Sequence, residues 1–395
     1  MLDLTYCKRC VMPETNEGNK FDENGICRSC VSAEQKMHIS WDDRFLKLRE
    51  IVEDIKADAL KKNLPYDCII PISGGKDSVF QLHVLTKVLG LRVLTVTFSH
   101  NWYSKVGMYN LWNALEQFEV DHIQFTPNRK LISTAAKGSL EKIGDACWHC
   151  HSGVGAFPLH IAVKFKIPML IWGESAAEVS GRATHFDPVI RFDRDYFIKI
   201  SSKVTVADFS KNPEEKRLFQ MLEPPTLQEC DDVGVSGIHL GDFIFWDEER
   251  QTEFIKQEYN WIEDKVEGAY KGYKSVECIM PGVHDFTNYL KRGFGRATVQ
   301  ASGDVRQGLM RRSEALEFAQ KIDSIEPNAL NYYLEVAGYS RKEFYEIMES
   351  QKKHALKDQL IPIKNLDEER TLKPFIIEFI EEIRSTNATK DTRDS

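Results

Sequence analysis

Residues 67–78 read DCIIPISGGKDS, and they decide how the surrounding chain folds. The apolar run 67–72 is typical of a buried strand, and apolar residues at helical spacing follow Ser78. A glycine turn between a strand and a helix is a good anion site, because free backbone N–H groups and the positive end of the helix dipole point to one place. The glycines let the backbone approach a phosphate closely, and Lys76 adds a cation. The stretch therefore predicts a phosphate-binding loop.

The loop differs from the common nucleotide P-loop. That motif needs a glycine where Ile70 stands and a serine or threonine where Asp77 stands. The phosphate site is therefore expected to belong to another class of nucleotide-binding protein.

The pattern around the loop predicts an α/β fold. Short apolar runs alternate with helical patterns, which implies a parallel sheet with helices on both faces and a ligand site at the carboxyl ends of the strands. The predicted strands are 67–72, 91–98, 121–126 and 167–172, and the predicted helices are 41–63, 78–89, 106–118, 130–142 and 154–165. Farther on, helices are predicted at 313–322, 327–337 and 340–353. We divide the chain into a cysteine module at 1–40, an α/β domain at 41–200, a mostly helical region at 201–384 and a disordered polar tail at 385–395.

Composition narrows the class of protein. The chain has 395 residues, 42% of them hydrophobic, and a net charge of −8. An acidic chain is a poor candidate for nonspecific nucleic-acid binding. The sequence shows no apolar run long enough for a membrane span and no signal peptide, so a cytoplasmic location is expected.

Four cysteines near the start form two C-x2-C pairs separated by 16 residues. This spacing is typical of a zinc ribbon, in which four thiolates enclose one structural Zn²⁺. The predicted ligands are Cys7, Cys10, Cys27 and Cys30.

Cys147 and Cys150 form a third C-x2-C pair, just before a predicted helix and on the expected side of the active site. One interpretation is a second metal or iron–sulfur site with a third ligand from Cys230 or Cys278, and His149 or His151 could also ligate. The alternatives are a reactive thiol pair or two packed cysteines.

The order of these motifs resembles the N-acetyl sugar amidotransferase family, which belongs to the PP-loop ATP pyrophosphatase superfamily and acts in surface-polysaccharide and flagellin-sugar pathways. The residues that carry the resemblance are the cysteine ribbon, SGGKDS at 73–78, the pair at 147–150, WGES at 172–175, and the segments YLKRGFGRAT at 289–298 and ASGDVRQG at 301–308. The resemblance implies a HUP-type sheet domain. It also implies an ATP-dependent enzyme that converts the N-acetyl group of a nucleotide-activated sugar into an acetamidino group, as in O-antigen, lipopolysaccharide or flagellin sugar biosynthesis.

In such a reaction the amide oxygen is first adenylated, pyrophosphate leaves, and ammonia then displaces AMP. We expect the loop to hold ATP and pyrophosphate, and the resemblance suggests that Asp77 positions Mg²⁺. The adenine is expected near the end of the second strand, and Glu174 is expected either to act in the site or to cap the helix that begins at Ser175. The predicted catalytic residues are Lys76, Asp77 and Glu174, and the predicted ATP ligands are Ser73, Gly74, Gly75, Lys76, Asp77, Ser78, Thr97, Phe98 and Gly173.

Four cations amid the late glycines suit a substrate diphosphate or carboxylate, with a solvated basic loop as the alternative. They are Lys291, Arg292, Arg296 and Arg306.

Ammonia needs a source, and the sequence shows no glutaminase motif. The resemblance therefore implies a separate glutaminase subunit and a barrel-type partner that conducts ammonia. The main rival function is a PP-loop tRNA thiolase, which would adenylate a base and install sulfur with the help of Cys147 and Cys150.

Overall fold

A parallel sheet of five strands forms the centre of the chain, in the order β3-β2-β1-β4-β5. The structure is a computed structural model that describes residues 2–179, 183–188, 191–196, 204–210, 212–365 and 372–391. The strands are β1 (Cys68–Pro71), β2 (Val93–Phe98), β3 (Asp121–Phe125), β4 (Met169–Trp172) and β5 (Ser236–His239). The predicted α/β class is confirmed, as are the first four strands. The prediction missed β5, a four-residue edge strand whose sequence SGIH lacks an apolar run.

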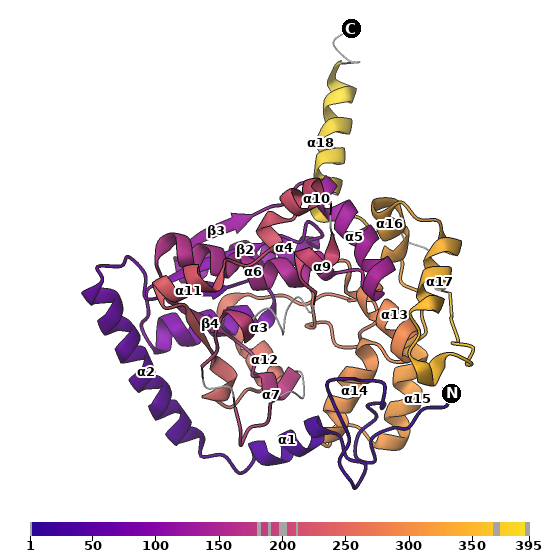
Figure 1. Cartoon of the computed structure of the whole chain (residues 1–395), viewed down its shortest axis with the longest axis horizontal. Helices are drawn as coiled ribbons and strands as arrows, with labels where there is room; N and C mark the ends of the chain where they lie inside the picture. Colours follow the sequence, from indigo (N-terminus) through magenta and orange to yellow (C-terminus); the bar gives the residue numbers. More distant parts are fainter. Residues whose placement is uncertain are drawn as a thin grey trace.

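Helices cover both faces of the sheet (Figure 1). Alternate residues of β1 point to opposite faces, so that Ile69 belongs to one apolar core and Ile70 to the other. The core around Ile70 includes α2 (Trp41–Lys61), α3 (Lys76–Leu82), η1 (His83–Val88), α4 (Lys105–Phe118) and α12 (Glu248–Tyr259). The segment η1 is a π-helix where one continuous α-helix was predicted.

The core around Ile69 joins the sheet to the late helices of the chain. On this face α5 (Arg129–Ile143) and α6 (Trp148–Phe165) lie between the strands and the C-terminal helices. Tyr333, which is fully buried, donates from its hydroxyl to the carbonyl of Ala136 in α5 at 2.8 Å. The C-terminal helices here are α13 (Pro281–Arg292), α16 (Ala329–Ala337) and α17 (Arg341–Ser350). The α/β part and the helical part therefore share one core, while the predicted domain boundaries stay predictions.

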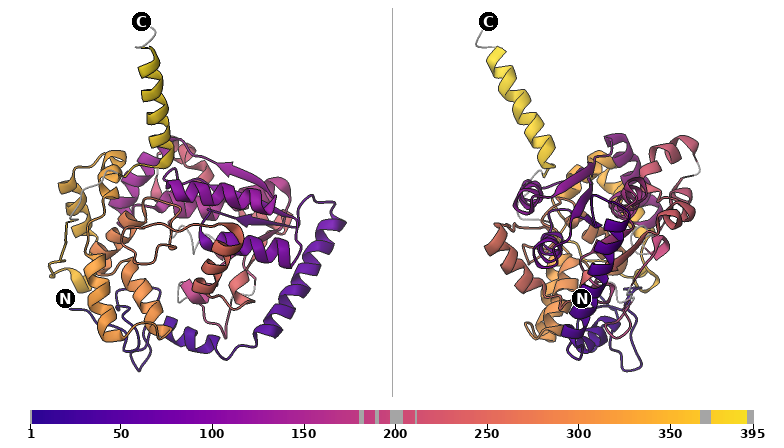
Figure 2. Two further views of the ribbon diagram at one scale, coloured as in Figure 1. Left: turned by 180° about the vertical axis from the view of Figure 1, so that it is seen from behind. Right: turned by 90° about the vertical axis from the view of Figure 1, so that its left-hand side faces the viewer.

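The N-terminal cysteine module packs against α14 (Arg296–Arg306) and α15 (Arg312–Asp323). The guanidinium of Arg312 donates to the carbonyls of Cys7 and Cys10 at 2.9–3.0 Å. From this module α1 (Arg28–Lys36) leads to α2, as Figure 2 shows from two further sides. The remaining short helices are α7 (Ala176–Val179), α9 (Val206–Phe209), α10 (Pro213–Leu218), η2 (Gln220–Leu222), α11 (Leu227–Val233), η3 (Leu240–Asp242) and η4 (His354–Leu356).

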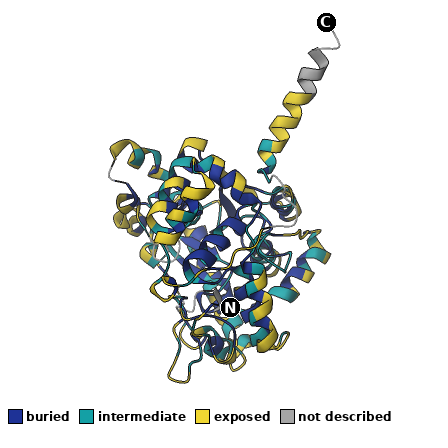
Figure 3. Ribbon diagram, turned by 90° about the vertical axis from the view of Figure 1, so that its right-hand side faces the viewer, coloured by how far each residue is buried: buried dark blue, intermediate teal, exposed yellow. Residues whose placement is uncertain are grey.

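The last helix, α18 (Phe375–Asp391), projects away from the body of the molecule, and most of its described surface is exposed (Figure 3). It continues through residues 385–391, where the sequence analysis predicted disorder. The segment 375–391 contains no glycine or proline, which permits a continuous helix. Residues 392–395 lie outside the described part of the chain. Among the described helices, none is long and apolar enough to cross a membrane.

Candidate functional site

The glycine loop lies between the end of β1 and the start of α3, as predicted. Gly74 has a φ of +84°, and a Cβ there would lie 2.7 Å from the backbone nitrogen of Leu111. The indole of Trp261 donates to the carbonyl of Gly74 at 2.9 Å. Only glycine fits this turn, because a side chain would meet both the left-handed backbone and the neighbouring helix.

The two loop serines are engaged within the loop itself. The hydroxyl of Ser73 accepts from the N–H of Gly75 at 3.2 Å, and the hydroxyl of Ser78 donates to the carbonyl of Gly75 at 2.9 Å. Gly75 is also the residue that precedes the first turn of α3. Both serine hydroxyls are therefore used to fix the shape of the loop.

Lys76 lies at the centre of a charged cluster. It is only 4% exposed, and its Nζ lies 2.5 and 2.6 Å from the two carboxylate oxygens of Asp77. The carboxylates of Glu174 and Glu248 each approach Nζ to 3.8 Å. Burial opposes the charge on Lys76, but the three carboxylates outweigh it and raise its pKa above the usual value.

The two glutamates differ in their protonation. Burial raises the pKa of Glu174 to about 8, and the charge of Asp77 adds to the shift. Burial acts on Glu248 in the same direction, but Lys76 and Lys274 outweigh it and lower its pKa to about 2. All three carboxylates surround the Lys76 ammonium, which occupies the point between them.

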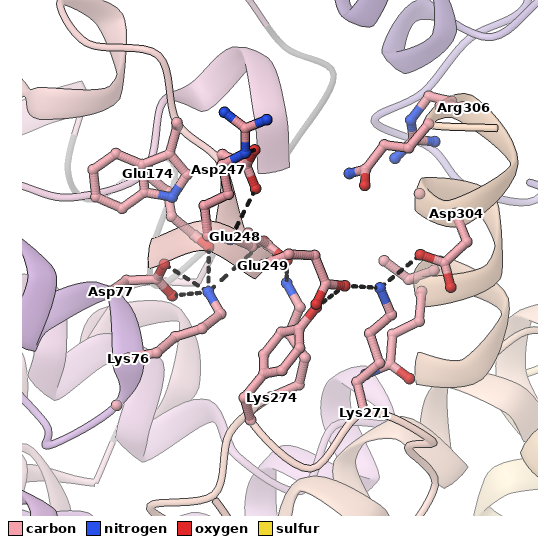
Figure 4. A pocket seen from close by; sticks show the side chains of 18 of the residues that line it. Lys76, Asp77, Glu174, Asp247, Glu248, Glu249, Lys271, Lys274, Asp304 and Arg306 are labelled. Carbon is pink, nitrogen blue, oxygen red and sulfur yellow. Dashed lines mark hydrogen bonds and ion pairs between the residues drawn. The ribbon is translucent and has the colours of Figure 1, made fainter. Parts of the chain in front are cut away.

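This cluster forms one end of a cavity of about 920 Å³ (Figure 4). The other walls come from the start of α12, the loop 271–277, the face of α14 and the end of α1. Two lysines of the loop pair with acidic side chains, Lys274 with Glu248 and Lys271 with Glu249 and Asp304. The cavity therefore has a wall of C-terminal residues facing the glycine loop.

The structure separates the four cations that the sequence analysis grouped as substrate ligands. Arg296 and Arg306 line the cavity. Lys291 is buried elsewhere, where its Nζ donates to the carbonyls of Ile143 and Gly144. Arg292 does not line the cavity either; it bonds to Asn288 and lies 3.6 Å from Glu17 of the cysteine module.

Three residues predicted near the nucleotide lie at the carboxyl ends of β2 and β4. The hydroxyl of Thr97 donates to the carbonyl of Ile72 at 2.5 Å, and Phe98 packs in the core. A Cβ on Gly173 would lie 3.2 Å from the ring of Trp246, which lines the cavity. Thr97, Phe98 and Gly173 are not themselves among the residues that line it.

The four N-terminal cysteines come together as predicted. All are buried, and their sulfurs lie within 4.8 Å of one another. Cys10 and Cys27 have sulfurs 3.6 Å apart, and those of Cys7 and Cys30 are 4.0 Å apart. Metal–sulfur bonds of about 2.3 Å in a tetrahedron place the sulfurs about 3.8 Å apart. Backbone N–H groups also donate to the Cys7 sulfur, as they do to thiolates, so this cluster fits a metal ion.

In the second cysteine pair, Cys147 lies close to an aspartate and a histidine. The ligand atoms of Asp145, Cys147 and His284 lie within 4.8 Å of one another. Burial raises the pKa of the Cys147 thiol well above its usual value, and the charges of Asp145 and Cys278 add to this shift.

Of the two candidate third ligands, Cys278 is close enough to the pair for their charges to interact. Burial raises the pKa of Cys278, with a further contribution from Cys150. Cys230 instead interacts with Arg194 and Asp231 in another part of the fold. Both ring nitrogens of His149, which is fully buried, have no hydrogen-bond partner among the described residues.

Three residues that line the cavity were not predicted from the sequence, namely Glu248, Lys274 and Glu277. Glu277 lies at the glycine loop, where a Cβ on Gly75 would be 3.1 Å from its carboxylate. Burial raises the pKa of Glu277. The acidic run at 247–249 carries a weak signal, because acidic residues in the first turn of a helix normally serve as caps.

Comparison with known proteins gives one family match. Residues 251–366 match the model of the C-terminal domain of LPS biosynthesis protein WbpG-like proteins. A curated relative, the uncharacterized protein MJ1599 of Methanocaldococcus jannaschii, is 28% identical over 116 residues. The matched region is 29% of this chain and 40% of that protein, so the chain spans less than half of the relative's length.

Two solved structures resemble the chain weakly. The NMN synthetase of Francisella tularensis is 15% identical, covers 55% of this chain and 87% of its own, and has a TM-score of 0.28. The U34-tRNA thiolase NcsA of Methanococcus maripaludis, solved with its [4Fe-4S] cluster, is 12% identical, covers 81% and 88%, and has a TM-score of 0.34. At these scores neither likeness carries an argument about this chain.

Proposed function

We propose that the chain is a PP-loop enzyme of the N-acetyl sugar amidotransferase family that uses ATP to convert an acetamido group of a nucleotide-activated sugar into an acetamidino group. The observation that carries the proposal is the cavity in which the glycine loop and Lys76 face the wall of α14. That wall belongs to the segment similar to LPS biosynthesis domains of the WbpG type. Because the two regions meet in one cavity, ATP and an acceptor sugar can react there.

The chemistry explains the parts of the site. An amide carbonyl is unreactive toward ammonia, so its oxygen first attacks the α-phosphorus of ATP and the bond to pyrophosphate breaks. The amide N–H proton is lost, and an O-adenylated imidate remains. Ammonia adds to the carbon, the bond to AMP breaks, and the product is an amidine. The overall reaction consumes amide, ATP and ammonia and yields amidine, AMP and pyrophosphate.

The loop and the acidic residues around it have separate tasks in this scheme. The N–H groups of the loop and the N-terminus of α3 bind the leaving pyrophosphate, and Lys76 neutralises its growing charge. Asp77 would position Mg²⁺, which supplies further charge neutralisation when bound, while Glu174 and Glu248 hold the Lys76 ammonium between them. Glu277, whose pKa is raised by burial, would orient the acceptor amide beside the loop.

The partners and the ribbon metal are part of the same proposal. The four N-terminal cysteines would hold Zn²⁺, because their geometry suits a closed tetrahedral site. A separate glutaminase subunit, with a barrel-type partner, would supply ammonia. No binding surface for either is assigned.

A tRNA thiolase is the second candidate, and one observation favours it. Cys278 is close enough to Cys147 and Cys150 for their charges to interact, and it follows Glu277, whose carboxylate reaches the glycine loop. Three thiols in that position could hold an iron–sulfur cluster that delivers sulfur. The acidic net charge of −8 argues against a tRNA substrate.

The test is incubation of the purified chain with ATP, Mg²⁺, ammonium and a panel of UDP- and CMP-linked acetamido sugars. We expect AMP and pyrophosphate as products, and a sugar lighter by about one mass unit because NH replaces oxygen. Lys76→Met should reduce turnover by about a thousandfold or more, since it removes charge stabilisation made mainly in the transition state. The matched control Lys342→Met, at an exposed lysine, should leave turnover unchanged. Release of ADP and phosphate, or sulfur incorporation into RNA with no change in any sugar, would overturn the proposal.

A further inference from the structure

The cationic side chains on the α14 side of the cavity are nearly all paired. Lys271 pairs with Glu249 and Asp304, Lys274 pairs with Glu248, and Arg296 pairs with Asp285. The Arg296 guanidinium also donates to the hydroxyl of Ser275 at 2.7 Å. These cations are already neutralised by the protein, so they shape the wall more than they attract an anion.

Arg306 differs from them. It is the last residue of α14 and lines the cavity, where Figure 4 shows its side chain beside the wall that carries Asp304. Its NH1 is buried and has no hydrogen-bond partner, and no carboxylate pairs with this guanidinium anywhere in the described part of the chain. A buried guanidinium N–H without an acceptor is unfavourable, so this group is arranged to receive one.

Gln300 lies one to two helical turns before Arg306 on α14 and also has a buried donor without a hydrogen-bond partner. It is 6% exposed and lines the cavity. Its Oε1 accepts from the backbone N–H of Tyr270 at 3.1 Å, which fixes the amide, while its Nε2 has no partner in the described structure. Two residues of one helix, each with an unpaired donor, therefore line the same cavity as the glycine loop, on a wall built from a different part of the chain.

We propose that Arg306 and Gln300 bind the anionic group of the acceptor substrate, a phosphate or a carboxylate, at the end of the cavity formed by α14. The inference rests on the proposed function, in which ATP occupies the glycine loop and a second, negatively charged substrate must bind opposite. A guanidinium suits this task because its planar donors match the oxygens of either group. Apolar side chains at the same rim, from Met37, Val299 and Leu309, offer contact for the uncharged rings of such a substrate.

The experiment measures the binding of a second anion by calorimetry. The full chain is first saturated with Mg²⁺ and α,β-methylene-ATP, which occupies the glycine loop, and is then titrated with UDP or with UDP-glucuronate. We expect the wild type to bind a further equivalent. Arg306→Met should weaken this binding roughly ten- to hundredfold, the effect of losing hydrogen bonds to a charged group. Arg306→Lys should fall between the two, because it keeps the charge and loses the paired donors.

Controls separate this effect from misfolding. Arg311→Met removes an arginine that is 85% exposed and only 4.0 Å from Glu314, so it should bind both probes like the wild type. Each variant must also bind α,β-methylene-ATP with unchanged affinity.

The two probes distinguish the sources of the charge. Equal weakening of UDP and UDP-glucuronate assigns Arg306 to the phosphates, and weakening of UDP-glucuronate alone assigns it to the sugar carboxylate. The inference is overturned if the wild type binds neither probe beside the ATP analogue, if Arg306→Met binds both as tightly as Arg311→Met, or if it loses the analogue as well. A chain that binds the second anion through Arg306 but releases no AMP in the turnover assay would refute the proposed function and leave this site standing.

Discussion

Replacement of Glu174 by glutamine should make the protein more stable above neutral pH while it removes activity. The carboxyl of Glu174 lies in a cluster with Asp77 and Glu248, and its pKa is raised to about 8. A raised pKa means that the folded state holds a proton which the unfolded state has released. Stability from this group is therefore complete at acid pH and is lost as the pH rises through about 8.

The size of the effect follows from the shift. A rise from the usual 4.5 to about 8 corresponds to an upper bound of about 5 kcal/mol, since each pKa unit is worth about 1.4 kcal/mol. The side chain keeps 29% of its surface exposed, so solvent screening reduces this bound, and we expect about 2 kcal/mol. Glutamine cannot ionise, so Glu174→Gln should gain this amount at pH 9 and little at pH 5.

The assay is urea denaturation without Mg²⁺ at pH 5, 7 and 9. Glu346→Gln, at an exposed glutamate that pairs with Lys342 at 3.7 Å, is the matched control and should change the free energy of unfolding by less than about 0.5 kcal/mol at each pH. Turnover of Glu174→Gln with ATP and Mg²⁺ should fall, because one of the carboxyl groups that hold the Lys76 ammonium has been replaced. A stability gain that is the same at pH 5 and pH 9, or a loss at pH 9, would refute the assigned environment of Glu174.

Two further predictions concern steric fit and the cysteine module. Gly107→Ala should cost about 1–3 kcal/mol of stability and weaken the binding of an ATP analogue, because its Cβ would lie 2.3 Å from the Cα of Glu277. Thermal unfolding would measure the loss of stability, and calorimetry would measure the binding. Gly303→Ala is the control, because its Cβ would meet only Arg306 at 3.9 Å, and a gain of up to about 1 kcal/mol from helix propensity is expected. Chelation of the ribbon metal, or Cys10→Ser, should lower the melting temperature, and elemental analysis should show the loss of one zinc ion. The affinity for the ATP analogue should change by no more than a few-fold, because the glycine loop is held by the sheet. Loss of analogue binding in step with the metal would show instead that ribbon and loop unfold together.

The sheet was largely predictable because its inner strands are buried on both faces. Such strands read as plain apolar runs, and the glycine turn after the first one marks its end. The edge strand β5 has neither signal. The π-helix η1 could not be predicted either, since its apolar spacing is close to that of an α-helix over six residues.

The candidate site was predictable on the loop side and much less on the opposite wall. Lys76, Asp77 and Glu174 follow strands whose ends meet at one edge, so position along the chain placed them together. In the late basic segment Arg296 and Arg306 line the cavity, but Lys291 instead holds the end of α5. Tertiary packing decides which side of a helix faces a cavity, and this cannot be predicted from composition.

The close crossing of two chain segments at Gly107 has a consequence for how this protein can change. The backbone of Glu277 passes where a side chain on Gly107 would stand, and its carboxylate lies 3.1 Å from the place of a Cβ on Gly75. A shortened chain that stopped before residue 277 would keep every residue of the SGGKDS motif and still lack the cover above it. The fit between the two segments therefore depends on glycine at position 107, so a rearranged chain that joins the loop to another C-terminal half must keep this residue.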